Sequence, residues 1–174
     1  MNYLITGVPG AGKTTVGEIL KKRGFRVIDI DAEHKLMRWL HKDTRKVGNH
    51  KVGMSKEWLR QHVWVWDDAK MDHLLKKDAG SPVFVVGTAS DIEKKLSLFD
   101  KVFLLRVSMK KVRERLANRP GKDAFGRGED EVGFVEEWQE EFEIGMIDRG
   151  ATPIDAEQPA QEVVREILNN IYNP

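Results

Sequence analysis

The sequence contains no cysteine, so disulfide bonds and catalysis by a thiol are excluded. It also has no apolar run close to the ~20 residues that a membrane-spanning helix requires. None of the five histidines stands four residues from another, as the helical zinc motif of metallohydrolases demands. The formal net charge of +1 shows no excess of either sign, so binding to a nucleic acid polymer or to a membrane is not expected.

The size and composition of the chain are those of one ordinary domain. Its 174 residues, of which 40% are hydrophobic, suffice for a single core over residues 1–174. The first expected strand begins at residue 2, so we expect no signal peptide. We expect a cytoplasmic protein that is a monomer or a homodimer.

Short apolar runs alternate along the chain with segments of helical periodicity. The expected strands are residues 2–6, 25–30, 82–86, 101–105 and 152–155, and the expected helices are residues 14–22, 33–41, 55–78, 108–118, 129–148 and 159–172. This alternation predicts an α/β fold with a mainly parallel sheet and right-handed crossovers. Two segments, 42–54 and 119–130, show no period and are expected to form a loop and a flexible flap.

A phosphate-binding motif stands near the start of the chain. Residues 7–14 read Gly-Val-Pro-Gly-Ala-Gly-Lys-Thr, which matches the complete G-x-x-x-x-G-K-[ST] loop. Its glycines let backbone N–H groups approach phosphate oxygens, because no Cβ stands in the way. Lys13 would reach the β- and γ-phosphates, and the Thr14 hydroxyl would ligate Mg²⁺. A strand before the loop and a helix after it complete the motif, which therefore predicts a nucleoside triphosphate site.

A second acid usually holds Mg²⁺ in such sites, at the end of a neighbouring strand. Among the next three expected strands, only the one at 25–30 ends in acids, Asp29 and Asp31. Strand residues two apart point to the same face, so both carboxylates could face the phosphates. As an alternative, Asp31 caps the helix that is expected to follow it. Asp91 is the reserve candidate for the metal-side acid.

Two arginines suit the charge that spreads over a transferring phosphoryl group, because a guanidinium binds phosphate oxygens in pairs. Arg115 and Arg119 are four residues apart near the end of an expected helix, so they lie on one face of it. Arg119 also opens the glycine-rich flap at 119–130. As an alternative, these basic residues only interact favourably with the negative, carboxyl-terminal end of the helix dipole.

Residues 32–80 are the expected acceptor region. They hold four of the five tryptophans, Trp39, Trp58, Trp64 and Trp66. Aromatic faces can stack a base or a sugar, although Trp58 and Trp66 also fit the spacing of a helix that packs on a core. Arg38, Arg45 and Arg60 are available to an anionic acceptor.

The phosphate loop, the acid-ended second strand, the R-x-x-x-R helix end and the short flap give the chain a family resemblance. It resembles the nucleoside and nucleotide kinase group, which includes adenylate, shikimate and gluconate kinases. The resemblance implies a three-layer P-loop NTPase fold with a five-stranded parallel sheet in the order 2-3-1-4-5, and a lid at about 119–130. It also implies that Asp29 lies near Mg²⁺, that Asp31 lies at the acceptor hydroxyl, and that Arg119 packs on the adenine.

The resemblance also implies a full set of site residues. The implied ATP-binding residues are Gly7, Gly10, Ala11, Gly12, Lys13, Thr14, Thr15, Arg119 and Ala156. The implied acceptor-binding residues are Asp31, Arg38, Arg60, Gly87 and Thr88, the catalytic residues Lys13, Asp31, Arg115 and Arg119, and the metal ligands Thr14 and Asp29.

The expected reaction is ATP- and Mg²⁺-dependent transfer of the γ-phosphoryl group to a nucleoside or nucleotide. One alternative is a kinase of a small hydroxylated metabolite, and another is an NTP-binding switch or assembly ATPase. Asp31 distinguishes the acceptors, because a hydroxyl acceptor profits from a carboxylate base whereas an ionised phosphate does not need one.

Overall fold

The computed structural model describes residues 1–31, 36–77, 81–120 and 125–173. The strands are β1 (Asn2–Thr6), β2 (Arg26–Asp29), β3 (Met37–His41), β4 (Val47–Gly48), β5 (His62–Trp66), β6 (Val83–Val86), β7 (Lys101–Arg106) and β8 (Thr152–Asp155). The helices are α1 (Lys13–Lys22), α2 (Lys56–Gln61), α3 (Asp68–Lys76), α4 (Met109–Ala117), α5 (Glu129–Asp148) and α6 (Ala160–Tyr172), with a 3-10 helix η1 (Ile92–Leu98). No described helix combines the length and the apolarity that crossing a bilayer demands.

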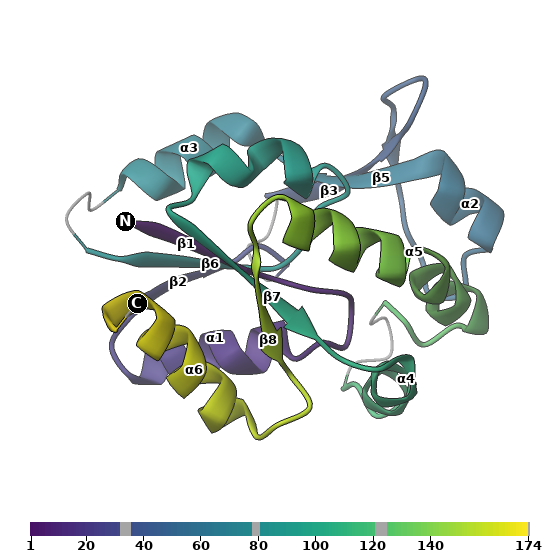
Figure 1. Cartoon of the computed structure of the whole chain (residues 1–174). Coiled ribbons are helices and arrows are strands. Elements are labelled where there is room, and N and C mark those ends of the chain that lie inside the picture. Colours follow the sequence, from purple (N-terminus) through teal and green to yellow (C-terminus); the bar gives the residue numbers. More distant parts are fainter. Residues whose placement is uncertain (32–35, 78–80, 121–124, 174) are drawn as a thin grey trace.

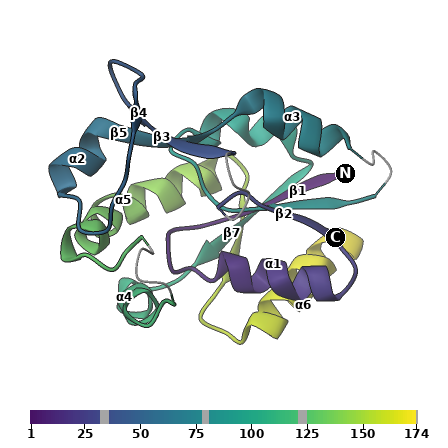
Figure 2. The ribbon, with the colours of Figure 1, turned by 180° about the vertical axis from the view of Figure 1, so that it is seen from behind.

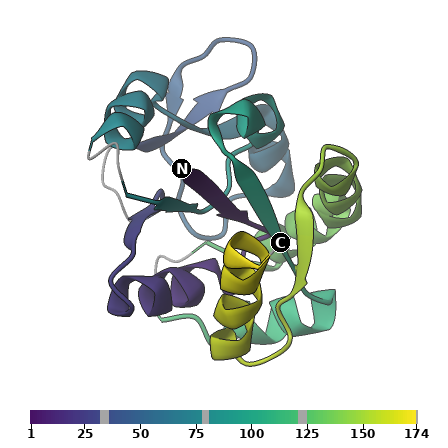
Figure 3. The same cartoon turned by 60° about the vertical axis from the view of Figure 1, so that its left-hand side comes forward.

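Five parallel strands form the main sheet, in the spatial order β2-β6-β1-β7-β8. Helices α1 and α6 lie side by side on one face of it, and α3 covers the other (Figures 1 and 3). Each of the five strands begins and ends within one residue of its expected range. The predicted α/β fold, with a five-stranded parallel sheet between helices, is confirmed.

The strand numbers differ from the expected ones. The resemblance implied the order 2-3-1-4-5 for a chain with five strands, and the main sheet is ordered β2-β6-β1-β7-β8. The labels differ because three further strands, β3, β4 and β5, precede β6 in the chain and build a sheet of their own. Counted within the main sheet alone, the strands stand in the order that the resemblance implied.

Alternate side chains of the main strands enter two separate apolar cores. In β1, Tyr3 and Ile5 pack in the core that α1 and α6 cover, whereas Leu4 packs with Met71 of α3 and Ile92 of η1. Because both faces of the sheet are buried, its strands must be apolar at nearly every position. This burial holds the carboxyl end of β1 in place, where the loop to α1 begins.

A second, antiparallel sheet of β4, β3 and β5 projects from the main body together with α2 (Figure 2). Two predicted helices are wrong here. In the first, expected at 33–41, residues 37–41 form β3, and residues 33–35 lie outside the described part of the chain. The second, at 55–78, is divided into α2, β5 and α3, and the loop expected at 42–54 contains β4. The run His-Val-Trp-Val-Trp at 62–66 alternates bulky side chains, which suits a strand better than a helix.

Candidate functional site

The phosphate loop connects β1 to α1 at the carboxyl edge of the main sheet. Gly12 precedes α1 with a φ of 99°, a left-handed conformation that strains any residue with a side chain. The buried ammonium of Lys13 donates hydrogen bonds to the carbonyl oxygens of Gly7 (2.8 Å) and Val8 (2.9 Å). An ammonium has three N–H donors, so one donor of Lys13 is left for a phosphate oxygen.

A cleft of about 1320 Å³ opens beside this loop. It exceeds the ~300–1,000 Å³ typical of a site for one small ligand, so a donor and an acceptor both have room. Of the ATP-binding residues that the resemblance implied, those that line the cleft are Gly10, Ala11, Gly12, Lys13, Thr14, Thr15, Arg119 and Ala156. Gly7, the first residue of the loop, is absent from the described lining and contributes a carbonyl that Lys13 binds.

The candidate acids occupy three different environments. Asp29 ends β2 and is buried, and its Oδ1 accepts a hydrogen bond from the backbone N–H of Asp31 at 3.1 Å. Asp31 lines the cleft, and its Oδ1 accepts a hydrogen bond from the indole Nε1 of Trp64 at 3.3 Å. Asp91 forms an ion pair with Lys95 at 3.3 Å. Of these three acids, Asp31 is the one in the described lining of the cleft.

Lys13 and Asp31 act on each other's protonation. Burial lowers the pKa of Lys13 to about 8, and the negative charge of Asp31 is the strongest opposing influence. Asp31 keeps an exposed surface in the open cleft, yet the walls around it exclude enough bulk water to raise its pKa. Lys13 and the hydrogen bond from Trp64 both lower that pKa in part. Each residue is therefore the strongest charged influence on the other.

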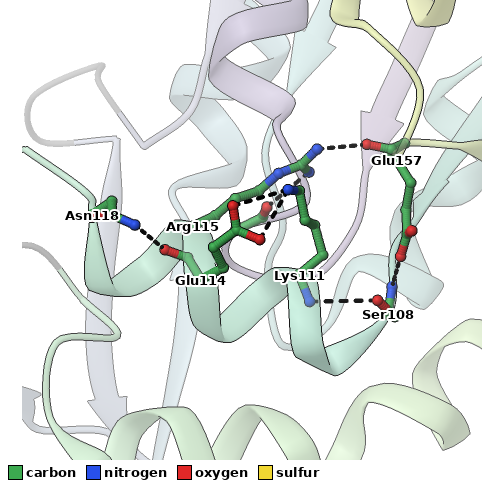
Figure 4. A network of polar contacts seen from close by, with 8 residues as sticks. Ser108, Lys111, Glu114, Arg115, Asn118 and Glu157 are labelled. Atoms are coloured by element: carbon green, nitrogen blue, oxygen red, sulfur yellow. Dashed lines mark hydrogen bonds and ion pairs between the residues drawn. The ribbon is translucent and has the colours of Figure 1, made fainter.

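The guanidinium of Arg115 binds backbone carbonyls of two loops. Its Nη1 donates to the oxygens of Gly10 (3.3 Å) and Ala11 (3.1 Å), and its Nη2 donates to that of Ala156 (2.8 Å). Figure 4 shows Arg115 on α4 with its guanidinium pointing away from the helix toward these loops. Arg115 thus joins the phosphate loop to the segment between β8 and α6. Its predicted direct role in catalysis stays a prediction.

Two further contacts tie the surroundings of α4 together. The backbone N–H of Ser108 donates to the carboxylate of Glu157 at 2.9 Å (Figure 4). Arg119, just after α4, lines the cleft, and its Nη1 donates to the carbonyl oxygen of Phe125 at 3.3 Å. The predicted flap at 119–130 therefore reaches the cleft through Arg119 and Phe125, and its last two residues belong to α5. Its residues 121–124 lie outside the described part of the chain.

The glycine predicted to contact the acceptor plays another part. Thr88 lines the cleft, but the neighbouring Gly87 is absent from the described lining. A Cβ on Gly87 would lie 2.1 Å from Cγ1 of Ile30, and Gly87 has a φ of 143°. Gly87 is therefore required for the close approach of β6 to the segment after β2.

Arg38 and Arg60 are not brought to the described cleft, which corrects their predicted place at the acceptor. Arg38 forms an ion pair with Asp67 at 3.4 Å, and Arg60 forms one with Glu137 at 2.9 Å. The first error follows from the wrong helix. In a strand successive side chains point to opposite faces, so Arg38 points away from the side on which Trp39 lines the cleft.

Trp39, His50, Trp64 and Phe125 line the cleft, and we call these four side chains the aromatic wall. Sequence reasoning missed His50 and Phe125, which come from segments without any period. Trp39 and Trp64 stand opposite each other in the pairing of β3 with β5. The two-residue alternation at 62–66 was the signal that could have revealed this face.

The residues present fit Mg²⁺ bound beside a triphosphate. The Thr14 hydroxyl is at the cleft, and the carboxylates of Asp29 and Asp31 both act electrostatically on Lys13. Mg²⁺ takes one or two carboxylates together with substrate phosphates and keeps several waters. A dense cage is therefore not needed, and the described residues contain no cluster of three or more histidine, aspartate or glutamate side chains that could form one.

Known proteins place this geometry in a family. A family model described as an AAA domain matches residues 4–136. No curated protein matches the sequence. Deoxyadenosine kinase from M. mycoides superimposes with a TM-score of 0.59 at 20% identity, over 100% of each chain.

Two further solved structures share the fold. Shikimate kinase from Acinetobacter baumannii has a TM-score of 0.59 at 18% identity, over 99% of this chain and 93% of its own. A gluconokinase from Sinorhizobium meliloti 1021 has a TM-score of 0.56 at 22% identity, over 99% of this chain and 91% of its own. At such identities the likeness concerns the fold, whereas the family match covers most of the sequence. The chain therefore belongs to the AAA domain family, and its fold is that of P-loop kinases.

Proposed function

We propose that the protein is an ATP- and Mg²⁺-dependent kinase that transfers the γ-phosphoryl group to a small molecule, a nucleoside or nucleotide. The observation that carries this proposal is the pairing of Lys13 with Asp31 across one cleft. Lys13 belongs to the phosphate loop, whereas Asp31 lies toward the aromatic wall through its bond to Trp64. A donor side and an acceptor side therefore meet where a phosphoryl group can pass between them.

In this proposal the loop amides and Lys13 bind the β- and γ-phosphates of ATP. Thr14 and Asp29 hold Mg²⁺, which neutralises phosphate charge when it is bound. For a hydroxyl acceptor, the acceptor oxygen forms a bond to the γ-phosphorus while the bond to the leaving ADP oxygen breaks. The proton of the hydroxyl passes to Asp31, whose raised pKa makes it a better base than an ordinary aspartate.

Arg119 supports the transfer from the flap side of the cleft. Its guanidinium suits the negative charge of phosphates, and it lowers the pKa of both Lys13 and Asp31 through its own charge. The flap between Arg119 and α5 would exclude water, which competes with the acceptor for the phosphoryl group.

A kinase of a small hydroxylated metabolite is the second candidate. Asp31 favours it, because a carboxylate at the acceptor side serves any hydroxyl. The superposition on shikimate kinase and gluconokinase is compatible with it. The deoxyadenosine kinase structure, which holds dCMP, is equally compatible with a nucleoside acceptor.

An ATP-consumption screen over nucleosides, nucleotides, sugars and hydroxy acids tests the proposal, with the phosphorylated product identified by mass spectrometry. We expect acceptor-dependent turnover in the natural protein and none in Lys13→Ala. Lys22→Ala, on the exposed end of α1, is the matched control and should stay active. Undiminished transfer by a folded Lys13→Ala variant would overturn the assignment.

A further inference from the structure

The aromatic wall gives the acceptor side of the cleft a surface made of aromatic rings. The rings of Trp39 and Trp64 lie 5.2 Å apart between centroids and are tilted by 41°. The ring of Trp39 is also nearly parallel to those of His50, at 5.6 Å and 26°, and Phe125, at 6.3 Å and 27°. All four side chains are half-buried, so each keeps surface that faces the cleft. Such rings bind planar groups by stacking, whatever the exact pattern of polar atoms on them.

The arginines of the described cleft lining are already engaged. Bidentate guanidinium groups are the usual partners of phosphate. Arg115 binds backbone carbonyls of the loops, and Arg119, which donates to the carbonyl oxygen of Phe125 beside the aromatic wall, is assigned by the proposed function to the phosphates that are transferred. Arg38 and Arg60 are held by Asp67 and Glu137 away from the described lining. Apart from Lys13 and the two arginines, the described lining of the cleft offers the cation Lys42, which is an exposed point charge on a flexible stem.

Carboxylates also line the cleft. Asp31, Glu93 and Glu141 are among them. Glu93 is neutralised by Arg149 at 2.9 Å, whereas Glu141 is exposed and forms no ion pair among the described residues. A phosphate dianion placed against this wall would meet repulsion, while a neutral or cationic group would not.

Trp64 joins the wall to the reacting end of the cleft. Its ring belongs to the aromatic wall, and its Nε1 donates to Oδ1 of Asp31 at 3.3 Å. A planar group stacked on this wall therefore places its substituents beside the carboxylate. A hydroxyl is the substituent that this carboxylate can bind, because its oxygens accept hydrogen bonds from O–H groups.

We propose that the acceptor is a planar, uncharged or cationic molecule that carries a hydroxyl, such as a nucleoside, and that its phosphorylated form is excluded by the aromatic wall and the carboxylates beside it. This inference rests on the proposed function and narrows it from nucleoside or nucleotide to nucleoside-like acceptors.

Calorimetric titration tests the inference without requiring turnover. The protein is saturated with Mg²⁺ and a nonhydrolysable ATP analogue, then titrated with deoxyadenosine, deoxycytidine, their 5′-monophosphates and shikimate. We expect a nucleoside to bind at least about tenfold more tightly than its monophosphate, and shikimate to bind more weakly still. A monophosphate or shikimate that binds as tightly as the nucleosides, or the absence of nucleoside binding, would overturn the proposal.

Variants of Trp39 test whether the aromatic wall is the acceptor-binding site. Trp39→Leu should weaken nucleoside binding about tenfold, whereas Trp39→Phe, which keeps an aromatic plane, should lose about threefold or less. Tyr172→Leu, an exposed aromatic at the end of α6, is the matched control and should change nothing. The affinity for the ATP analogue reports that each variant is folded. Equal nucleoside binding in all three variants would show that the aromatic wall is not part of the acceptor site.

The two proposals fail in different ways. Nucleoside binding without turnover on any acceptor would contradict the kinase assignment and leave the acceptor inference standing. Turnover on a hydroxy acid or a nucleotide, with nucleosides left unbound, would contradict the acceptor inference and leave the kinase assignment standing.

Discussion

The indole Nε1 of Trp64 donates a hydrogen bond to Oδ1 of Asp31 at 3.3 Å. Trp64 belongs to β5 of the small sheet, whereas Asp31 follows β2 of the main sheet. The bond stabilises the charged carboxylate and so opposes the burial that raises its pKa. The small sheet therefore orients and tunes the proposed base as well as lining the acceptor side.

Trp64→Phe removes this bond and keeps an aromatic ring in the wall. The pKa of Asp31 should rise further, because one of the influences that lowers it is lost. A base must be deprotonated to act, so the acidic limb of the kcat/KM profile should move to higher pH. The measurement is that profile for the natural protein and the variant. Trp58→Phe is the matched control and should leave the acidic limb at the same pH. An acidic limb that does not move in Trp64→Phe would show that Trp64 has no influence on the pKa of the base.

Lys13→Met tests the buried charge of the phosphate loop. The pKa of Lys13 falls from 10.5 to about 8 on folding. Between these two values the unfolded chain binds the proton of Lys13 more tightly than the folded chain does, so the natural protein gains stability as the pH rises from about 8 to 10.5. Below about pH 8 the ammonium is charged in both states, and the full cost of burying that charge lowers the stability of the folded state. The stability of Lys13→Met relative to the natural protein should therefore fall by about 2–3 kcal/mol between about pH 7 and pH 10.

Urea unfolding at the two pH values measures this difference. Lys22→Met, with an exposed lysine, should show no such pH dependence relative to the natural protein. If the difference in unfolding free energy between Lys13→Met and the natural protein is the same at both pH values, the Lys13 ammonium stays well hydrated in the folded state.

Local patterns predicted the main sheet and the phosphate loop. The central strands β1, β6 and β7 are apolar on both faces, so their burial could be inferred from a few consecutive residues. The motif at 7–14 is likewise contiguous, and the structure places its Lys13 and Thr14 at the cleft. Asp31 was found because it follows a strand whose end meets the end of β1 at the same sheet edge.

The small sheet was not predictable in the same way. Apolar residues of 55–78 fit a helical period and a two-residue period at once, and long-range pairing with β3 decided between them. The wrong helix at 33–41 hid the alternation that separates Trp39 from Arg38. Glu131 binds both His50 and the backbone N–H of Gly126, the residue after Phe125, and no local pattern encodes these contacts.

Arg115→Ala should loosen the donor side more than it slows the transfer step. The guanidinium binds the carbonyls of Gly10, Ala11 and Ala156, so its loss leaves three acceptors to find other partners. Hydrogen bonds from a charged donor contribute about 1.5–3 kcal/mol, which sets the expected loss of unfolding free energy. The KM for ATP should rise as well, because the phosphate loop loses a brace. Arg113→Ala, in an exposed ion pair with Glu136, is the control.

Kinetics separate the two roles considered for Arg115. A brace predicts a raised KM and lowered stability, with kcat changed less. A large fall in kcat at constant KM and stability would show that the guanidinium stabilises the transition state instead.

Gly87→Ala should be strongly destabilising. The added Cβ would lie 2.1 Å from Cγ1 of Ile30 and 2.7 Å from its Cδ1, so the strand end or Ile30 must shift. Overpacking of this kind, together with the left-handed φ, costs about 2–4 kcal/mol. Gly150→Ala is the matched control, because Gly150 has a φ of 89° with nothing within 4 Å of the added Cβ. It should lose only about 1 kcal/mol, from the backbone alone. Equal losses in thermal unfolding would rule out the clash as the cause.

Glu131→Gln tests how the aromatic wall is anchored. Glu131 is fully buried, and its Oε2 accepts hydrogen bonds from the backbone N–H groups of Gly126 and Gly128, both at 3.0 Å. Its Oε1 lies 2.7 Å from Nε2 of His50. One carboxylate thus holds the end of the flap, the start of α5 and a ring of the wall. An amide presents one oxygen in place of two, so a donor is left facing an N–H group.

The expected loss of unfolding free energy for Glu131→Gln is about 2–4 kcal/mol, because a buried charged acceptor loses its partners. Hydrogen exchange should quicken at Gly126 and Gly128, whose amides are released. Glu136→Gln, an exposed position on the same helix, should leave both the stability and the exchange rates close to those of the natural protein. Faster exchange together with weakened acceptor binding would show that Glu131 acts through His50 and Phe125. Faster exchange with unchanged acceptor binding would limit the role of Glu131 to the flap, because the aromatic wall would then keep its position without the Glu131 carboxylate.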